Sequence, residues 1–262
     1  MSAAKGLPVE RMALVTKRDL KVAALVLGIC CSAHALAESL PLVSGNDYAP
    51  YADEKLPHGG MATEIVQKAF EAAGLKSHID WLPWARNLAA VQSGRYAATY
   101  PYRKTAERKR DFYFSEPVFE SEERIFARRG SKLNGADLSS VLKKRICLPP
   151  GWSAPDPIAT LLAKEKIQVE RPNDISTCIR MIAVGRADFF VTDGIQGRAT
   201  LAQIRQQDVV QMPGVVARSA YHLLTARNNE HAVRWLNAFN QGLAQLKKSG
   251  AYRRIVLEHG GE

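Results

Sequence analysis

Strand-like and helix-like segments alternate twice along the chain, and this is the sequence feature that most restricts its fold. In residues 88–100 (LAAVQSGRYAATY) and 179–191 (IRMIAVGRADFFV), apolar residues stand six and three positions before a glycine, which is followed by an arginine and a strand-like run. Both segments have the pattern of a helix that ends at glycine and leads into a strand. This repeat of about 90 residues predicts an α/β protein with helices on the faces of its sheets. Two such units in one chain indicate two lobes.

Apolar periodicity and turn residues mark the individual elements. In the first unit we predict strands over 40–45, 77–82 and 96–102, and helices over 61–73 and 84–93. In the second unit we predict strands over 144–151, 167–170 and 187–193, and helices over 155–166 and 174–184. The rest predicts a helix over 194–207, strands over 208–212 and 220–226, and a helical stretch over 230–258 broken near Gly250. The chain would cross between the lobes at 120–129 and 214–219.

The first 37 residues have the composition of a secretion signal. Basic residues precede the apolar run VAALVLGICC (22–31), and Ala-Leu-Ala at 35–37 has the small-x-small form that signal peptidase cleaves. The alternative is a membrane anchor, but the apolar run has only 10 residues, whereas a spanning helix needs about 20. We therefore expect residues 1–37 to be a signal peptide that is removed on export.

The net charge restricts the class of partner. The chain carries a formal charge of +10, and residues 1–37 contain five Lys or Arg and two Asp or Glu, so their removal leaves +7. A basic surface fits nucleic acid, acidic ligands or an acidic membrane face. Export and the scatter of the charges argue against nucleic acid, because only residues 103–110 are densely basic.

Two cysteines, Cys147 and Cys178, remain after residues 1–37 are removed. In an oxidising compartment an isolated pair most often forms a disulfide, which we predict here. A buried pair of free thiols is the alternative. A metal site is not predicted, because two cysteines and six scattered histidines give no ligand spacing.

The densest charge cluster, residues 107–111, runs directly into the aromatic residues FYF within TAERKRDFYFSEPVF (105–119). Neither an amphipathic helix nor an alternating strand produces such a junction. Taken alone, the cluster favours a surface ion pair of Arg108 with Glu107 or Asp111.

Five segments carry a family resemblance when they are taken in their order and spacing: GNDYAPY (45–51), WARNLAAVQSGR (84–95), TAERKRDFYFSEPVF (105–119), GRADFFVTD (185–193) and LNAFNQGLAQLKKSGAYRRIVLEHG (236–260). Together they resemble the family-3 extracellular solute-binding proteins, the periplasmic amino-acid receptors of ABC transporters. The resemblance implies a type II periplasmic-binding-protein fold, in which two α/β lobes are joined by two crossing strands. It places residues 38–126 and 220–262 in lobe 1 and residues 127–219 in lobe 2.

The resemblance also implies a function. The protein would be periplasmic, would have no catalytic activity and no cofactor, and would capture an amino acid or related carboxylate in the cleft between its lobes. Closure of the lobes about a hinge would follow, and the closed form, expected to be a monomer, would dock on the membrane permease of an ABC transporter. No nucleic-acid partner is implied.

Lobe 1 would contribute Arg108, Tyr48 and Trp84 to the implied site. The family's Thr-x-x-Arg motif falls on Thr105 and Arg108, so Arg108 would hold the ligand carboxylate. A planar guanidinium offers two parallel donors to a carboxylate and stays charged when it is desolvated. Tyr48 and Trp84 would place aromatic faces on the ligand, and ordinary core packing is the alternative for both.

The implied site also includes residues of lobe 2. Gly151, Trp152 and Ser153 match a loop whose backbone amides and hydroxyl meet the carboxylate from the opposite lobe, although Trp152 departs from the Gly-Thr-Thr pattern of that loop. Asp193 would pair with the α-ammonium group of the ligand. That role is compatible with capping of the helix that follows Asp193.

Tyr102 and Arg103 follow Pro101 where the family usually has small hydroxyl residues, and we include both in the predicted site. An extra arginine and an extra tyrosine in the cleft would select an acidic or aromatic ligand, or a ligand other than an amino acid.

Two other functions are compatible with the sequence. One is an orphan receptor that presents its closed form to a sensor or another partner. The other is a dehydratase-like enzyme on the same fold, which would need a positioned acid or base. Glu116 and Asp156 are available carboxylates, but neither lies in a motif that specifies chemistry, and no Ser-His-Asp or Cys-His arrangement is present in the sequence.

Overall fold

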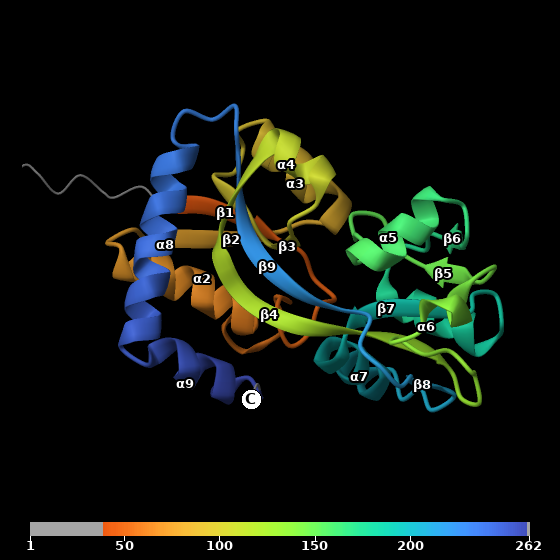
Figure 1. The fold of residues 1–262 in the computed structure, drawn as a ribbon. Helices are drawn as coiled ribbons and strands as arrows, with labels where there is room; N and C mark the ends of the chain where they lie inside the picture. The colour runs from red at the N-terminus through yellow and green to blue at the C-terminus, as the bar shows by residue number, and fades with distance from the viewer. Residues whose placement is uncertain (1–38, 261–262) are drawn as a thin grey trace, which may run out of the picture. The chain divides into compact units, whose positions relative to one another are not determined.

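The computed structural model describes residues 39–260, and the predicted signal peptide lies outside them. In this part of the chain, strands form one mixed sheet in the order β2-β1-β3-β9-β4-β7-β5-β6, and β8 pairs with β4 (Figure 1). The strands are β1 (Leu40–Ser44), β2 (Ser77–Trp81), β3 (Ala98–Arg103), β4 (Phe112–Arg128), β5 (Arg145–Cys147), β6 (Gln168–Glu170), β7 (Phe189–Asp193), β8 (Val209–Gln211) and β9 (Ala217–Ala226). The α-helices are α2 (Met61–Ala72), α3 (Trp84–Gln92), α4 (Ala106–Asp111), α5 (Asp156–Ala163), α6 (Ile175–Ala183), α7 (Gly194–Gln203), α8 (Ala232–Lys248) and α9 (Ala251–Glu258), with 3-10 helices η1 (Pro57–Gly59) and η2 (Leu138–Val141).

The first lobe is built on three parallel strands. β1 pairs with β2 on one side and with β3 on the other, and Figure 1 shows α2 and α8 lying beside this part of the sheet. The two helices pack closely because Gly242 of α8 has no side chain: a Cβ there would lie 1.8 Å from the carbonyl oxygen of Ala69 in α2. Their facing apolar residues join the sheet in one core, which includes Leu42, Ile65, Phe70, Tyr100, Leu223 and Phe239.

Two antiparallel strands join the lobes. β4 and β9 pair from Phe112 opposite Ala226 at one end to Glu123 opposite Ala217 at the other, and Figure 1 shows them running side by side between the lobes. β4 then continues to Arg128 and pairs with β7 and β8. The FYF segment that follows the charge cluster is therefore the beginning of the longest strand of the described structure.

The second lobe repeats the α/β arrangement. β5 pairs in parallel with β6 and β7. Two apolar clusters form the core of this lobe, and their members include Ile125, Ile146, Ile158, Phe189, Phe126, Ile179 and Phe190. A disulfide between Cys147 of β5 and Cys178 of α6 confirms the predicted bond. The second lobe therefore has a covalent link between its sheet and one of its covering helices.

The ends of several predicted elements differ from the structure. The strand predicted over 144–151 is limited to Arg145–Cys147, because Pro149 and Pro150 have no N–H for a sheet ladder. The C-terminal stretch is divided into α8 and α9 at Gly250, whose φ of 75° ends the first helix as predicted. No helix in residues 39–260 is long and apolar enough to cross a membrane.

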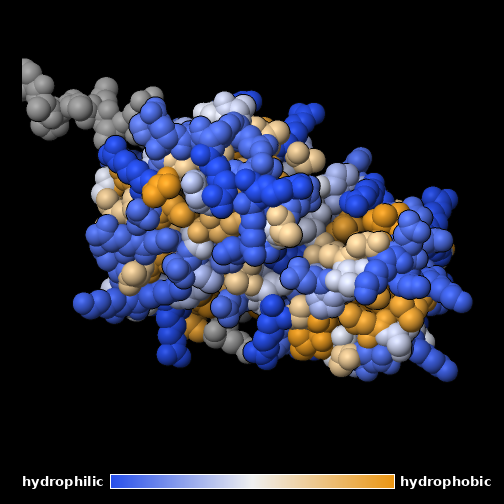
Figure 2. All heavy atoms as spheres, turned by 45° about the horizontal axis from the view of Figure 1, so that its top comes forward, coloured by the Kyte–Doolittle hydropathy of each residue, from blue (hydrophilic) through white to orange (hydrophobic). Residues whose placement is uncertain are grey.

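Hydrophilic residues cover most of the face shown in Figure 2, and hydrophobic residues form separate groups on it. The large hydrophobic side chains that are exposed in the described structure come from separate segments: Leu142, Val169, Val184, Val233 and Leu257. Scattered exposed residues of this kind are ordinary for a protein surface. A cavity is therefore a better candidate for a functional site than these exposed apolar residues.

Candidate functional site

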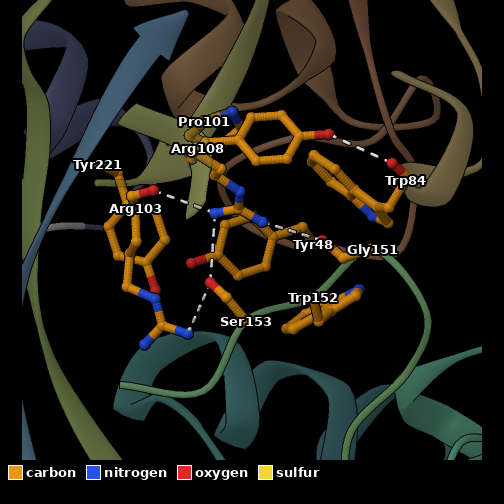
Figure 3. Close-up of a pocket in the computed structure, with 10 residues that line it drawn as sticks. Tyr48, Trp84, Pro101, Arg103, Arg108, Gly151, Trp152, Ser153 and Tyr221 are labelled. Carbon is orange, nitrogen blue, oxygen red and sulfur yellow. Dashed lines mark hydrogen bonds between the residues drawn. The ribbon is translucent and has the colours of Figure 1, made fainter. Parts of the chain in front are cut away.

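One cavity brings together residues from both lobes (Figure 3). It has a volume of about 360 Å³, including the part that is open to solvent, and its lining residues are Tyr48, Trp84, Pro101, Tyr102, Arg103, Arg108, Gly151, Trp152, Ser153 and Tyr221. Every predicted ligand-binding residue except Asp193 is among them. Tyr221, which lies on the strand β9 that joins the lobes, was not among the predicted site residues.

Arg108 is placed in this cavity by a short capped helix. The Thr105 side chain caps α4 by accepting a hydrogen bond from the backbone N–H of Arg108 at 3.2 Å. The guanidinium then reaches across to the second lobe, where Nη1 donates to Ser153 Oγ at 3.2 Å and Nη2 donates to the Gly151 carbonyl oxygen at 3.2 Å. Nη1 also donates to the carbonyl oxygen of Arg103 at 3.0 Å. Arg108 is thus a contact between the lobes as well as a lining residue.

The charge of Arg108 has no counterion in the described structure. The residue is only 8% exposed, and burial, together with the nearby charge of Arg103, lowers the pKa of its guanidinium to about 10. None of the ion pairs among residues 39–260 includes Arg108, so the pairing with Glu107 or Asp111 that the bare cluster favoured does not occur in this structure. A buried cation in contact with neutral acceptors alone is costly to desolvate unless an anion pairs with it.

Arg103 lies beside Arg108 but is paired. Its Nη1 is 3.3 Å from Glu123 Oε1, and Glu123 is only 1% exposed. Tyr221 donates from its hydroxyl to the same carboxylate oxygen at 2.6 Å. Burial and the charge of Glu123 raise the pKa of Tyr221 well above its usual value, so its hydroxyl keeps its proton. Arg103, Glu123 and Tyr221 therefore form an internally balanced group.

Three aromatic rings form the apolar side of the cavity. The Tyr48 ring centroid is 6.1 Å from that of Trp84 and 5.4 Å from that of Trp152, and both pairs meet at nearly right angles. The Trp84 indole is held by a hydrogen bond from Nε1 to the carbonyl oxygen of Asn46 at 2.7 Å. Its ring also lies against Gly45, where a Cβ would be 2.5 Å from it. The hydroxyl of Tyr48 is buried without a hydrogen-bond partner.

Asp193 lies outside the residues that line this cavity. It caps α7, because its Oδ1 accepts hydrogen bonds from the backbone N–H groups of Ile195 and Gln196, both at 2.9 Å. The same oxygen accepts from the hydroxyl of Tyr51, in the first lobe, at 2.8 Å. The capping alternative is present in the structure, and the contact of Asp193 with a ligand ammonium stays a prediction.

Asp47 makes a further contact between the lobes. Its Oδ2 accepts a hydrogen bond from the backbone N–H of Ile175, the first residue of α6, at 3.2 Å. Burial raises the pKa of Asp47 to about 6, and the neighbouring carboxylates Asp174 and Asp53 act in the same direction. No group of three or more potential metal ligands was found in residues 39–260.

Comparisons with known proteins agree with this architecture. The model of the bacterial extracellular solute-binding proteins, family 3, matches residues 40–262. Among curated proteins, the chain is similar to a probable histidine-binding protein of Neisseria gonorrhoeae, with 21% identity over 223 residues, which cover 83% of this chain and 81% of the relative.

Solved structures share the fold. A histidine kinase sensor domain with similarity to periplasmic binding proteins has 22% identity and a TM-score of 0.73, with 86% of this chain and 96% of the other covered. An ancestral arginine-binding protein bound to arginine has 21% identity and a TM-score of 0.73, with coverage of 85% and 98%. These likenesses confirm the predicted two-lobed α/β fold of periplasmic binding proteins.

Proposed function

The chain belongs to the bacterial extracellular solute-binding proteins of family 3, and from this premise we propose that it captures a small carboxylate, an amino acid or a related compound, between its lobes. We further propose that it acts in the periplasm after removal of residues 1–37 and delivers its ligand, as a monomer, to the membrane permease of an ABC transporter. The family and the fold are those of binding proteins, and we propose no catalytic activity.

The state of the Arg108 guanidinium supports this proposal most directly. A guanidinium has five N–H donors, and the hydrogen bonds of Arg108 in the described structure use both donors of Nη1 and one of Nη2. The Nε–H and one N–H of Nη2 remain. A carboxylate can accept from two guanidinium nitrogens at once, and it would supply the negative charge that the buried cation lacks.

The division of the chain between the lobes gives the cleft its means of closing. We propose lobe 1 as residues 38–126 and 220–262 and lobe 2 as residues 127–219, hinged on β4 and β9. Arg108 then comes from one lobe and its partners Gly151 and Ser153 from the other. A ligand bound at Arg108 would add contacts to both lobes and would favour the closed form.

A sensor role is the second candidate, because a histidine kinase sensor domain is among the solved structures with the same fold. In that role the closed form would be read by a signalling partner, and no permease would be needed. Both roles use the same ligand site. They differ in whether loss of the protein abolishes uptake of the ligand.

Thermal unfolding of the purified chain in the presence of amino acids, hydroxy acids, dicarboxylates and amines, each near 1 mM, tests the binding function. A ligand with a micromolar dissociation constant would add about 4.1 kcal/mol of stability, which raises the midpoint of a protein of this size by about 8–16 °C. The hit should disappear in Arg108→Met and persist in Arg110→Met, which changes an exposed arginine of the same helix.

The functional role is then tested with the hit itself. Uptake of the labelled ligand by cells with and without the protein separates transport from sensing. Recovery of the ligand unchanged after prolonged incubation with the protein is expected of a binding protein. Conversion of the ligand would instead support the enzyme alternative.

A further inference from the structure

We propose that the ligand is an apolar carboxylate without an α-ammonium group, such as a 2-hydroxy acid, and is not an amino acid. This inference rests on the proposed function and narrows its ligand class. It depends on the charges, the free polar atoms and the aromatic surfaces of the cavity around Arg108 (Figure 3).

The cavity offers one uncompensated positive charge and no negative one. Arg103 and Arg108 line it, and no Asp or Glu does. The charge of Arg103 is balanced by Glu123, which is buried and also accepts from Tyr221. A carboxylate would neutralise the remaining charge of Arg108. The ammonium of an amino acid would bring in a positive charge that has no partner, and desolvating such a charge is costly.

Two neutral acceptors of the cavity are already engaged by arginine side chains. The Gly151 carbonyl oxygen and Ser153 Oγ accept from the guanidinium of Arg108, and Ser153 Oγ also accepts from Arg103 at 3.3 Å. Groups of the cavity with unused hydrogen-bonding capacity include the two free N–H donors of Arg108, Nη1 of Arg103 and the hydroxyl of Tyr48. A hydroxyl can donate and accept, so it matches a ligand hydroxyl, whereas an ammonium presents three donors and no acceptor.

Asp193, the predicted partner of the ligand ammonium, makes other contacts in the structure. Asp193 Oδ1 accepts hydrogen bonds from the hydroxyl of Tyr51 and from two backbone N–H groups at the start of α7. Tyr51 is itself fixed, because its ring stacks on Phe119 with centroids 4.2 Å apart and planes within 1°. Phe119 stacks in turn on Tyr221 at 4.7 Å. Through Oδ1, Asp193 therefore contributes to the contact between the lobes, and it is not among the residues that line the cavity.

The remaining surface of the cavity is aromatic. Tyr48, Trp84 and Trp152 present rings from both lobes. The hollow of about 360 Å³ that these residues line includes the part that is open to solvent. An aromatic or branched apolar group beside the carboxylate would fill this space and cover the rings.

Isothermal titration calorimetry with matched pairs of ligands tests the inference. The pairs are L-phenylalanine with L-phenyllactate, and L-leucine with L-2-hydroxy-4-methylpentanoate. Within each pair only the α-substituent changes from ammonium to hydroxyl. We expect at least one hydroxy acid to bind about ten-fold or more tightly than its amino acid, because an unpaired buried charge costs more than an unpaired buried polar group. Arg108→Met should abolish this binding, and Arg110→Met should retain it.

Each other outcome overturns a defined part of the reasoning. Amino acids that bind as tightly as the hydroxy acids, or more tightly, and that depend on Arg108 would refute the inference and support the proposed function. The same conclusion follows if neither pair binds but another amino acid does. If a folded protein binds no carboxylate of the wider panel, both the inference and the proposed function are wrong.

Discussion

Replacing Arg108 by methionine is expected to remove most of the affinity for a carboxylate. Methionine keeps a long apolar chain beside the Tyr102 ring, over which the guanidinium now lies at 4.7 Å. The change removes the Nε–H and the Nη2–H that are available to a ligand. Hydrogen bonds to charged groups contribute about 1.5–3 kcal/mol each. The two together predict a loss of about 3–6 kcal/mol, which is roughly a 10²- to 10⁴-fold increase in Kd.

Calorimetric titration with the carboxylate that gives the largest thermal shift measures this loss. Arg110→Met is the matched control, because it removes an exposed arginine two positions along the same helix. Arg108→Lys separates charge from geometry: an ammonium keeps the positive charge but cannot offer two parallel donors, so we expect an intermediate Kd. Thermal unfolding without ligand establishes that each variant is folded.

A Kd of Arg108→Met that stays within ten-fold of the parent, in a variant that unfolds cooperatively, would contradict the assignment. It would mean that the free donors of Arg108 do not meet the ligand. The buried cation would then serve only to join the lobes through Gly151 and Ser153.

Three further predictions concern stability. Reduction of the Cys147–Cys178 bond, or replacement of both cysteines by serine, should release a loop with a sequence separation of 31. The bond contributes about 3–4 kcal/mol to the free energy of unfolding, so calorimetry should show a thermal unfolding midpoint that is lower by about 6–16 °C. Because the pKa of Asp47 is raised from 3.8 to about 6 on folding, the folded protein binds the proton more tightly and loses stability as pH rises through this window. Asp47→Asn should therefore unfold at a higher temperature than the parent at pH 7 and at a similar temperature below pH 4, and equal midpoints at pH 7 would contradict the buried position of the carboxylate. Gly242→Ala should lower the unfolding midpoint in urea by separating α8 from Ala69, with a loss of about 1–3 kcal/mol or more, whereas an unchanged midpoint would show that the helices can move apart freely.

The role of Arg108 in the cavity was predicted from the family resemblance, because the local charge cluster alone favoured a surface ion pair. Thr105 caps α4 by accepting from the backbone N–H of Arg108, but a cap of this kind acts on the backbone and does not specify an arginine side chain. The alternating elements could be predicted from the residues themselves, since the period of the apolar residues reflects which face of each helix or strand is buried.

The partners of the site could not be predicted, because they are distant in the sequence. Tyr221 donates to Glu123, which is 98 residues away, and Tyr51 donates to Asp193, which is 142 residues away. These contacts follow from the register of β4 with β9 and β7. Neither the apolar period nor any local motif specifies that register. The sequence therefore indicated a ligand role for Asp193 but not its hydrogen bond with Tyr51.

Arg103 and Arg108 are equivalent as charges in the sequence, but in the structure only Arg103 is paired with a carboxylate. Glu123, which pairs with β7 opposite Asp193, lies 3.3 Å from Arg103 and balances it. Arg108 has only neutral acceptors. Two arginines in a cleft would favour a dicarboxylate, but one balanced and one free guanidinium favour a single carboxylate. A second carboxylate group would approach Glu123 and would meet no free cation, so its desolvation would not be offset. On the proposed function, we therefore expect a monocarboxylate to bind more tightly than the corresponding dicarboxylate, although the two arginines alone favour the opposite choice.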